Sequence, residues 1–168
     1  MNASTRDSLS SLGLLILRVG MGGYLATHGW GKLQMVIGGH FDQFGDPIGL
    51  GNTASLILAT GAEFVCALLV VVGLGTRLAA APVVFTMGVA AFVVHGANPW
   101  TMGEGYRLYM EKLAESWASK EPAMLFLIAF LALMFTGPGK YSIDALICGR
   151  KGRNAANPAT TGSPPAKA

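Results

Sequence analysis

Four apolar stretches, separated by polar or glycine-rich segments, dominate the pattern of hydrophobic and polar positions along the chain. They cover residues 9–27, 53–72, 78–95 and 122–136. As helices, the first three are long enough to cross the roughly 30 Å hydrocarbon core of a bilayer, and the fourth is slightly short. The brief turn at 73–77 requires the second and third stretches to run antiparallel. The pattern therefore predicts an all-α fold, a four-helix transmembrane bundle.

The polar segment before the fourth stretch has a helical period of its own. Between residues 99 and 121, Tyr106, Tyr109, Leu113 and Trp117 recur at spacings of three and four residues. This spacing places them on one face of a helix. We expect an additional amphipathic helical segment there, lying in the membrane interface or against the bundle.

The segments outside the apolar stretches divide the chain into three parts. We expect a cytoplasmic N-terminus over residues 1–8, a four-span membrane domain over 9–147, and a basic, then disordered, cytoplasmic tail over 148–168. Gly-Gly, Asp-Pro and Gly-Leu-Gly turn signals lie between residues 29 and 52. They predict an external loop with little regular structure.

The composition agrees with a multi-pass membrane protein. Charged residues make up 12% of the 168 residues and apolar residues 52%, whereas soluble domains carry about 25% charged residues. Four spans and their loops leave no room for a separate soluble enzyme domain. The net charge of +3 forms no basic stripe, so the lipid bilayer is an expected partner and nucleic acid is not.

The distribution of basic residues predicts the orientation in the membrane. The termini and the second loop hold seven lysines and arginines, and the first and third loops hold four. Cytoplasmic loops carry the excess of basic residues. We therefore expect both termini in the cytoplasm.

Two opposite charges stand alone near the midpoints of the first two apolar stretches, Arg18 and Glu63. An isolated ion near the bilayer midplane is costly, so we expect the two side chains to face each other inside the bundle. This buried polar site has two interpretations. It either binds a proton, an anion or the head group of a lipid-soluble molecule, or it is a clamp that fixes the register of two helices.

Two histidines form a second candidate site. The first and third spans run in the same direction, so His28 and His95 should lie at the same outer face, with Lys32 one helical turn beyond His28. The functional hypothesis is a shared ligand-binding site for a quinone head group or a metal. The structural alternative is a pair of interfacial residues, because Trp30 and Trp100 lie close by in the sequence.

The first loop contains a weaker group of potential metal ligands, His40, Asp42 and Asp46. The glycines around them provide no rigid geometry, so we predict no metal site there. No pattern in the sequence identifies a catalytic residue.

A structural motif is expected where the fourth span ends. Glycines and a proline stop the helix, and Ser142 or Asp144 can cap whatever helix follows. Asp144 can alternatively pair with Arg77 across the same face. The residues of this motif are Arg77, Gly137, Pro138, Gly139, Ser142 and Asp144.

The order and spacing of these features over residues 9–147 resemble the DoxX family. The resemblance is carried by Arg18, His28-Gly29, Lys32, Glu63, the segment Gly73-Leu74-Gly75-Thr76-Arg77 and the segment from Gly137 to Asp144. It implies a small bundle of four membrane helices in the bacterial inner membrane. It also implies an association with thiosulfate:quinone oxidoreductase or with membrane complexes that control thiols under oxidative stress.

The resemblance implies redox proteins as partners and admits quinone as a cofactor. The chain itself has no dithiol pair and no evident cofactor signature, so we expect an oxidoreductase-associated subunit without complete catalytic machinery of its own. Two alternatives stay open. One is a transport module for a small solute or a proton, which would call for a homo-oligomer, and the other is a non-catalytic structural partner.

Overall fold

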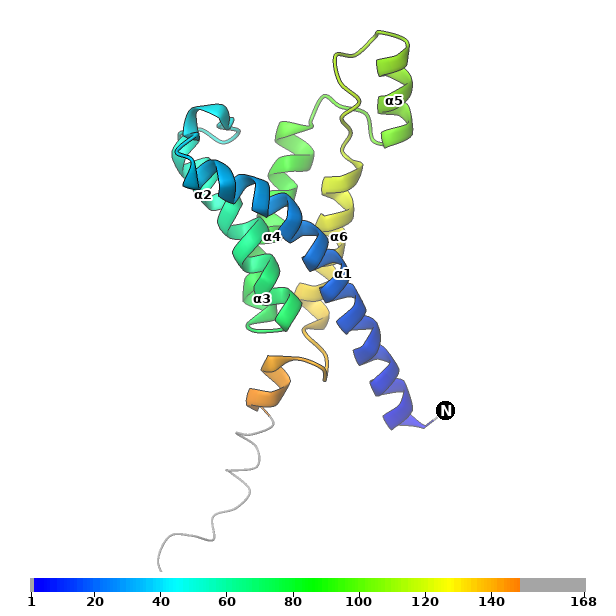
Figure 1. Cartoon of the computed structure of the whole chain (residues 1–168). Helices are drawn as coiled ribbons and strands as arrows, with labels where there is room; N and C mark the ends of the chain where they lie inside the picture. The colour runs from blue at the N-terminus through cyan, green and yellow to red at the C-terminus, as the bar shows by residue number, and fades with distance from the viewer. Residues whose placement is uncertain (1, 149–168) are drawn as a thin grey trace, which may run out of the picture.

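The computed structural model describes residues 2–148, and every regular element in this part of the chain is a helix (Figure 1). The all-α prediction is confirmed. The elements in order are α1 (Ala3–Ile37), the 3₁₀ turn η1 (Phe41–Gln43), α2 (Asn52–Thr60), the π-helix η2 (Gly61–Cys66), α3 (Ala67–Val72), α4 (Thr76–Val89), the π-helix η3 (Ala90–Val94), α5 (Met102–Met110) and α6 (Glu121–Thr136). Residues 143–148 form a further helical turn.

Three continuous helices are long and apolar enough to cross a membrane. They are Ala3–Ile37, Asn52–Val72 and Thr76–Val94, the second and third each containing a π-helical segment. The fourth predicted span corresponds to α6, which is apolar but only 16 residues long. These helices identify a membrane protein.

Helix α1 is much longer than its apolar stretch. It continues to Ile37, whereas the predicted end is residue 27, and its 35 residues correspond to about 52 Å. The expected loop after residue 29 is therefore wrong for residues 29–37, which are helical. Packing at Gly29 accounts for the longer helix. A Cβ there would lie 2.5 Å from the carbonyl carbon of Glu63, so this part of α1 lies directly against η2. Close helix packing at Gly29 offsets the roughly 1 kcal/mol that glycine costs inside a helix.

The helices pack around a core of small and medium apolar residues. In Figure 1, α1 crosses the other long helices obliquely, and its first turns project past them at the N-terminal end. Helix α1 packs against η2 and α3, while α6 packs chiefly against α4. The core residues are Leu25, Ala26, Ala67, Val70, Ala79, Ala80, Val83, Met87, Phe126, Phe130 and Leu133.

We call the two ends of the bundle the turn end, with residues 73–76 and 137–144, and the loop end, with residues 38–51 and 95–120. At the turn end, α3 stops at Gly73, which has a left-handed backbone (φ 74°). A Cβ on Gly73 would collide with the guanidinium of Arg18 and lie 2.6 Å from Cβ of Ser142. Glycine is thus required both for the turn and for the close approach of two other segments.

Gly73→Ala is expected to destabilise the protein more than Gly75→Ala. Both glycines have positive φ, but a Cβ on Gly75 meets no atom within 4 Å. Gly75→Ala should cost about 1–2 kcal/mol for the left-handed backbone alone, and Gly73→Ala should add the displacement of Arg18. Thermal unfolding of both variants in detergent measures the difference. Equal melting temperatures would show that the arginine tolerates the methyl group.

The predicted amphipathic segment is only partly helical. Helix α5 covers Met102–Met110 and begins at Thr101, whose hydroxyl accepts a hydrogen bond from the Glu104 amide at 3.2 Å. Trp117 lies outside the helix, so the predicted extent is wrong. Lys112 has a positive φ of 58° and reverses the chain. We call residues 100–119 the flap, and Figure 1 shows its helix beyond the ends of α4 and α6.

Candidate functional site

The predicted pairing of Arg18 with Glu63 is wrong. The Arg18 guanidinium donates to the carbonyl oxygens of Val70 and Val71, each at 3.4 Å, and to that of Tyr141. The carboxylate of Glu63 is paired with Lys32 instead. The register explains the error, because the residue of α1 that packs on Glu63 is Gly29, eleven residues and therefore about 16 Å beyond Arg18.

Arg18 lies at the turn end and is fully buried. Two of its acceptors, the carbonyls of Val70 and Val71, belong to the last turn of α3, where the helix dipole places partial negative charge. Its third acceptor, Tyr141, belongs to the segment that follows α6. Arg18 therefore joins three parts of the chain, which favours the clamp interpretation for this residue.

The other residues of the predicted motif also lie at the turn end. The carboxylate of Asp144 accepts hydrogen bonds from the amides of Gly75 (2.7 Å) and Thr76 (3.0 Å) and from the Thr76 hydroxyl (3.2 Å). It therefore caps α4, and its predicted pairing with Arg77 is wrong. Arg77 donates instead to the carbonyl of Phe135 at 3.4 Å.

The other residues of this motif make local structural contacts. The Ser142 hydroxyl accepts from the Ala145 amide at 3.1 Å and so caps the helical turn that follows. Gly137 and Gly139, on either side of the half-buried Pro138, have positive φ. Gly137 ends α6 beside Arg77, and a Cβ on Gly139 would lie 3.3 Å from atoms of α1.

The stability of the turn end should depend on acid pH through Asp144. Burial raises the pKa of this carboxyl, but hydrogen bonds from Thr76 and Gly75 and the charge of Arg18 outweigh it, so the pKa is lowered from its ordinary 3.8. A lowered folded-state pKa contributes stability above about pH 4, which is lost as the pH falls through the folded-state value. We expect Asp144→Asn to lower the melting temperature at pH 7, and the difference from the wild type to shrink as the pH falls below about 4. An unchanged difference at pH 3 would assign the effect to geometry.

Lys32 and Glu63 form a partly buried ion pair near the loop end. Their side chains are 24% and 6% exposed, and Glu63 lies in η2. The second π-helix, η3, ends directly before His95. Single π-helical turns occur frequently at functional sites. Here η2 contains Glu63 and η3 ends at His95, and both residues line one cavity.

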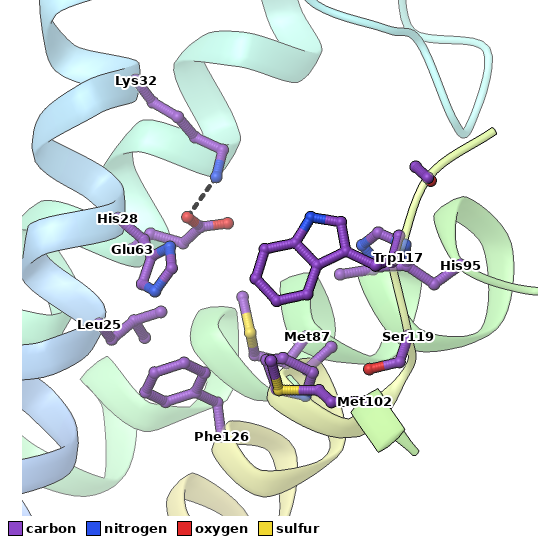
Figure 2. A pocket seen from close by; sticks show the side chains of 15 residues that line it. Leu25, His28, Lys32, Glu63, Met87, His95, Met102, Trp117, Ser119 and Phe126 are labelled. Carbon is purple, nitrogen blue, oxygen red and sulfur yellow. Dashed lines mark hydrogen bonds and ion pairs between the residues drawn. The ribbon is translucent and has the colours of Figure 1, made fainter. Parts of the chain in front are cut away.

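The ion pair lines a first cavity of about 410 Å³, shown in Figure 2. The structure brings together all three predicted ligand-binding residues, His28, Lys32 and His95, and adds Glu63 to them. His28 packs edge-on against Phe126 at 6.0 Å between ring centroids. The other side chains labelled in Figure 2 are Leu25, Met87, Met102, Trp117 and Ser119.

A second cavity of about 340 Å³ is also lined by the ion pair. The two cavities share Lys32, Glu63, Ala90 and His95. Apart from these, the second is lined mainly by apolar side chains, including Phe44, Ile48, Leu58, Phe85, Val89 and Val94. A polar centre is thus placed between a mixed cavity and an apolar one, as an amphiphilic ligand requires.

Sequence reasoning missed Ser119 as a site residue. It is buried in the wall of the first cavity, and its hydroxyl has no hydrogen-bond partner among residues 2–148. A lone serine in a polar segment carries no periodic or motif signal. Only the path of the flap brings it to the cavity.

Hydrogen bonds to Asp46 organise the first loop. Its carboxylate accepts from the amides of Gly51 (2.7 Å) and Leu50 (2.9 Å) and from the Ser55 hydroxyl (2.8 Å). The Gly51 amide, followed by Ser55, lowers the pKa of Asp46. Within residues 2–148, no three His, Cys, Asp or Glu side chains are grouped as metal ligands.

The family model named DoxX matches residues 13–96, which is 84 of the 168 residues. The match covers most of α1 and continues through η3, so it includes Arg18, His28, Lys32, Glu63 and His95. The flap and α6 lie outside it. Neither the curated proteins nor the solved structures gave a match.

Proposed function

Because the chain belongs to the DoxX family, we propose that it is a subunit of a membrane oxidoreductase system and binds a quinone at the two cavities that share Lys32 and Glu63. The observation that carries this proposal is the Lys32–Glu63 pair, which lines both the mixed first cavity and the apolar second cavity. A quinone has both characters, since its head group accepts hydrogen bonds and its side chain is apolar. The second cavity provides space for the first part of that chain.

The charged residues have complementary roles toward such a head group. The Lys32 ammonium donates to a carbonyl oxygen and stabilises the negative charge that develops there on reduction. Glu63, buried beside it, exchanges one proton with the same oxygen, and the second proton of the two-electron reduction is exchanged with solvent at the other oxygen. The two electrons come from a redox group of a partner protein, because no residue pattern of this chain supplies one.

The proposed location is the bacterial inner membrane, with both termini in the cytoplasm. The excess of basic residues in the termini and the second loop supports this orientation. It places the loop end, with both cavities and the flap, toward the outer face. The redox partner would then approach from that side.

Mild detergent extraction followed by quinone analysis tests the proposal. We expect purified wild-type protein to retain quinone, measured by mass spectrometry of an organic extract. A Lys32→Gln variant should retain several-fold less, whereas Lys112→Gln, an exposed lysine of the flap, should retain as much as the wild type. The proposal fails if wild-type protein neither retains quinone nor binds an added short-chain quinone.

A second candidate function, transport of a proton or small solute, is favoured by the same buried Glu63 between two cavities. A pathway would also have to cross the turn end, where Arg18 is fully buried among three carbonyls. Reconstituted vesicles distinguish the two. Proton flux that disappears in Glu63→Gln supports transport, and tight vesicles exclude it.

A further inference from the structure

Ser119 is an unusual residue of the first cavity. It is 6% exposed, and its hydroxyl has no hydrogen-bond partner in the part of the chain that the structure describes. Buried hydroxyl groups in proteins are nearly always hydrogen-bonded, because leaving one unpaired costs free energy. The hydroxyl oxygen is itself closed off from solvent in the ligand-free structure, so a partner would have to reach it through the wall of the first cavity, which Ser119 lines.

The position of Ser119 is fixed by contacts on both sides of it. The backbone before it packs on α5, since a Cβ on Gly105 would lie 2.8 Å from the Trp117 carbonyl and 3.0 Å from that of Ala118. The residue after it, Lys120, donates its amide to the carbonyl of Pro99 at 3.0 Å. The backbone on both sides of Ser119 is thus fixed where the flap leads into α6.

Ser119 and the Lys32–Glu63 pair lie on different sides of the cavity. Figure 2 shows the ion pair on one side and Ser119 on the other, with Met87, Met102 and Trp117 in the region between them. The polar groups are therefore separated by apolar side chains. A matching ligand has an oxygen at each end of a flat apolar body.

We propose that Ser119 is a ligand-binding residue that hydrogen-bonds the second oxygen of a ring whose first oxygen meets Lys32 and Glu63. This inference rests on the proposed function and deepens it, because it specifies a ring with two opposite oxygens, such as a 1,4-quinone or its hydroquinone. A serine hydroxyl both donates and accepts. It therefore suits the carbonyl of the oxidised ring and the hydroxyl of the reduced ring.

The test compares two probes and two serine variants. The probes are 2-decyl-1,4-hydroquinone and 3-decylphenol, which lacks one oxygen, and calorimetry in detergent measures their dissociation constants. Ser119→Ala should weaken hydroquinone binding about five-fold, as for the loss of one neutral hydrogen bond, and leave phenol binding unchanged. Ser10→Ala, an exposed serine of α1 that lines neither cavity, should change neither.

Stability measurements separate ligand binding from a structural role. Because the free hydroxyl has no partner, Ser119→Ala should keep or raise the melting temperature of the ligand-free protein. A lower melting temperature, unchanged hydroquinone affinity, or an equal loss of phenol affinity would each overturn the role of Ser119. If the wild type binds neither probe, the proposed quinone site itself fails.

Discussion

Gly29→Ala is expected to cost about 3 kcal/mol or more of stability and to separate Lys32 from Glu63. A Cβ on Gly29 would lie 2.5 Å from the carbonyl carbon of Glu63 and from the amide nitrogen of Phe64. These are backbone atoms, so no side-chain rotation relieves the contact and the helices must move apart. Overpacking of this kind costs about 1–3 kcal/mol where flexible side chains can adjust, and more is expected where they cannot.

Thermal unfolding in detergent, followed by loss of helical circular dichroism, measures the effect. The matched control is Gly23→Ala, in the same helix, where a Cβ meets nothing within 4 Å. This change should be neutral or stabilising, since alanine favours the helix by up to about 1 kcal/mol. If both variants unfold at the same temperature, α1 does not approach η2 as closely as described.

Glu63→Met alone is expected to destabilise the protein by about 3 kcal/mol, and the double variant Lys32→Met/Glu63→Met to recover most of that loss. Removing one partner of a buried pair leaves the other charge uncompensated, which typically costs about 3–5 kcal/mol. The Lys32 side chain is 24% exposed, so the lower value is appropriate. An apolar pair of similar volume removes both charges and needs no compensation.

A double-mutant cycle of melting temperatures measures the coupling of the two residues. The control is the exposed pair Arg107–Glu111, at 3.5 Å, whose removal should change stability by less than about 0.5 kcal/mol. Exchanging the charges of Arg18 and Glu63 should not restore stability, because these residues have different partners. Recovery in that exchange would contradict the observed register.

The sequence was sufficient for the helical fold but not for the relative positions of the helices. The apolar stretches located the membrane helices, because side chains that face lipid must be apolar. Glycines correctly marked the ends of two helices, at Gly73 and Gly137. The same windows misplaced the end of α1. A helix continues beyond its apolar stretch when a neighbour packs on it, as η2 does on Gly29, and no local pattern reports that contact.

The candidate site was predicted in part for the same reason. His28, Lys32 and His95 were grouped correctly because helix direction alone brings them to one end. The partner of Glu63 was predicted wrongly. The residue of α1 that packs on Glu63 is Gly29, eleven residues beyond Arg18, and Lys32 lies close to Gly29 in the same helix. Ser119 was missed because its position depends on the fold of the flap, which long-range backbone contacts determine.

The contacts of Arg18 impose an order on the assembly of this protein during synthesis. The arginine is made near the start of the chain, yet one of its acceptors, Tyr141, leaves the ribosome only after α6. Until then, the guanidinium has the carbonyls of α3 alone. The segment that follows α6 therefore supplies the third acceptor of Arg18 only after the fourth apolar helix has been made, so a late part of the chain fixes the position of an early one.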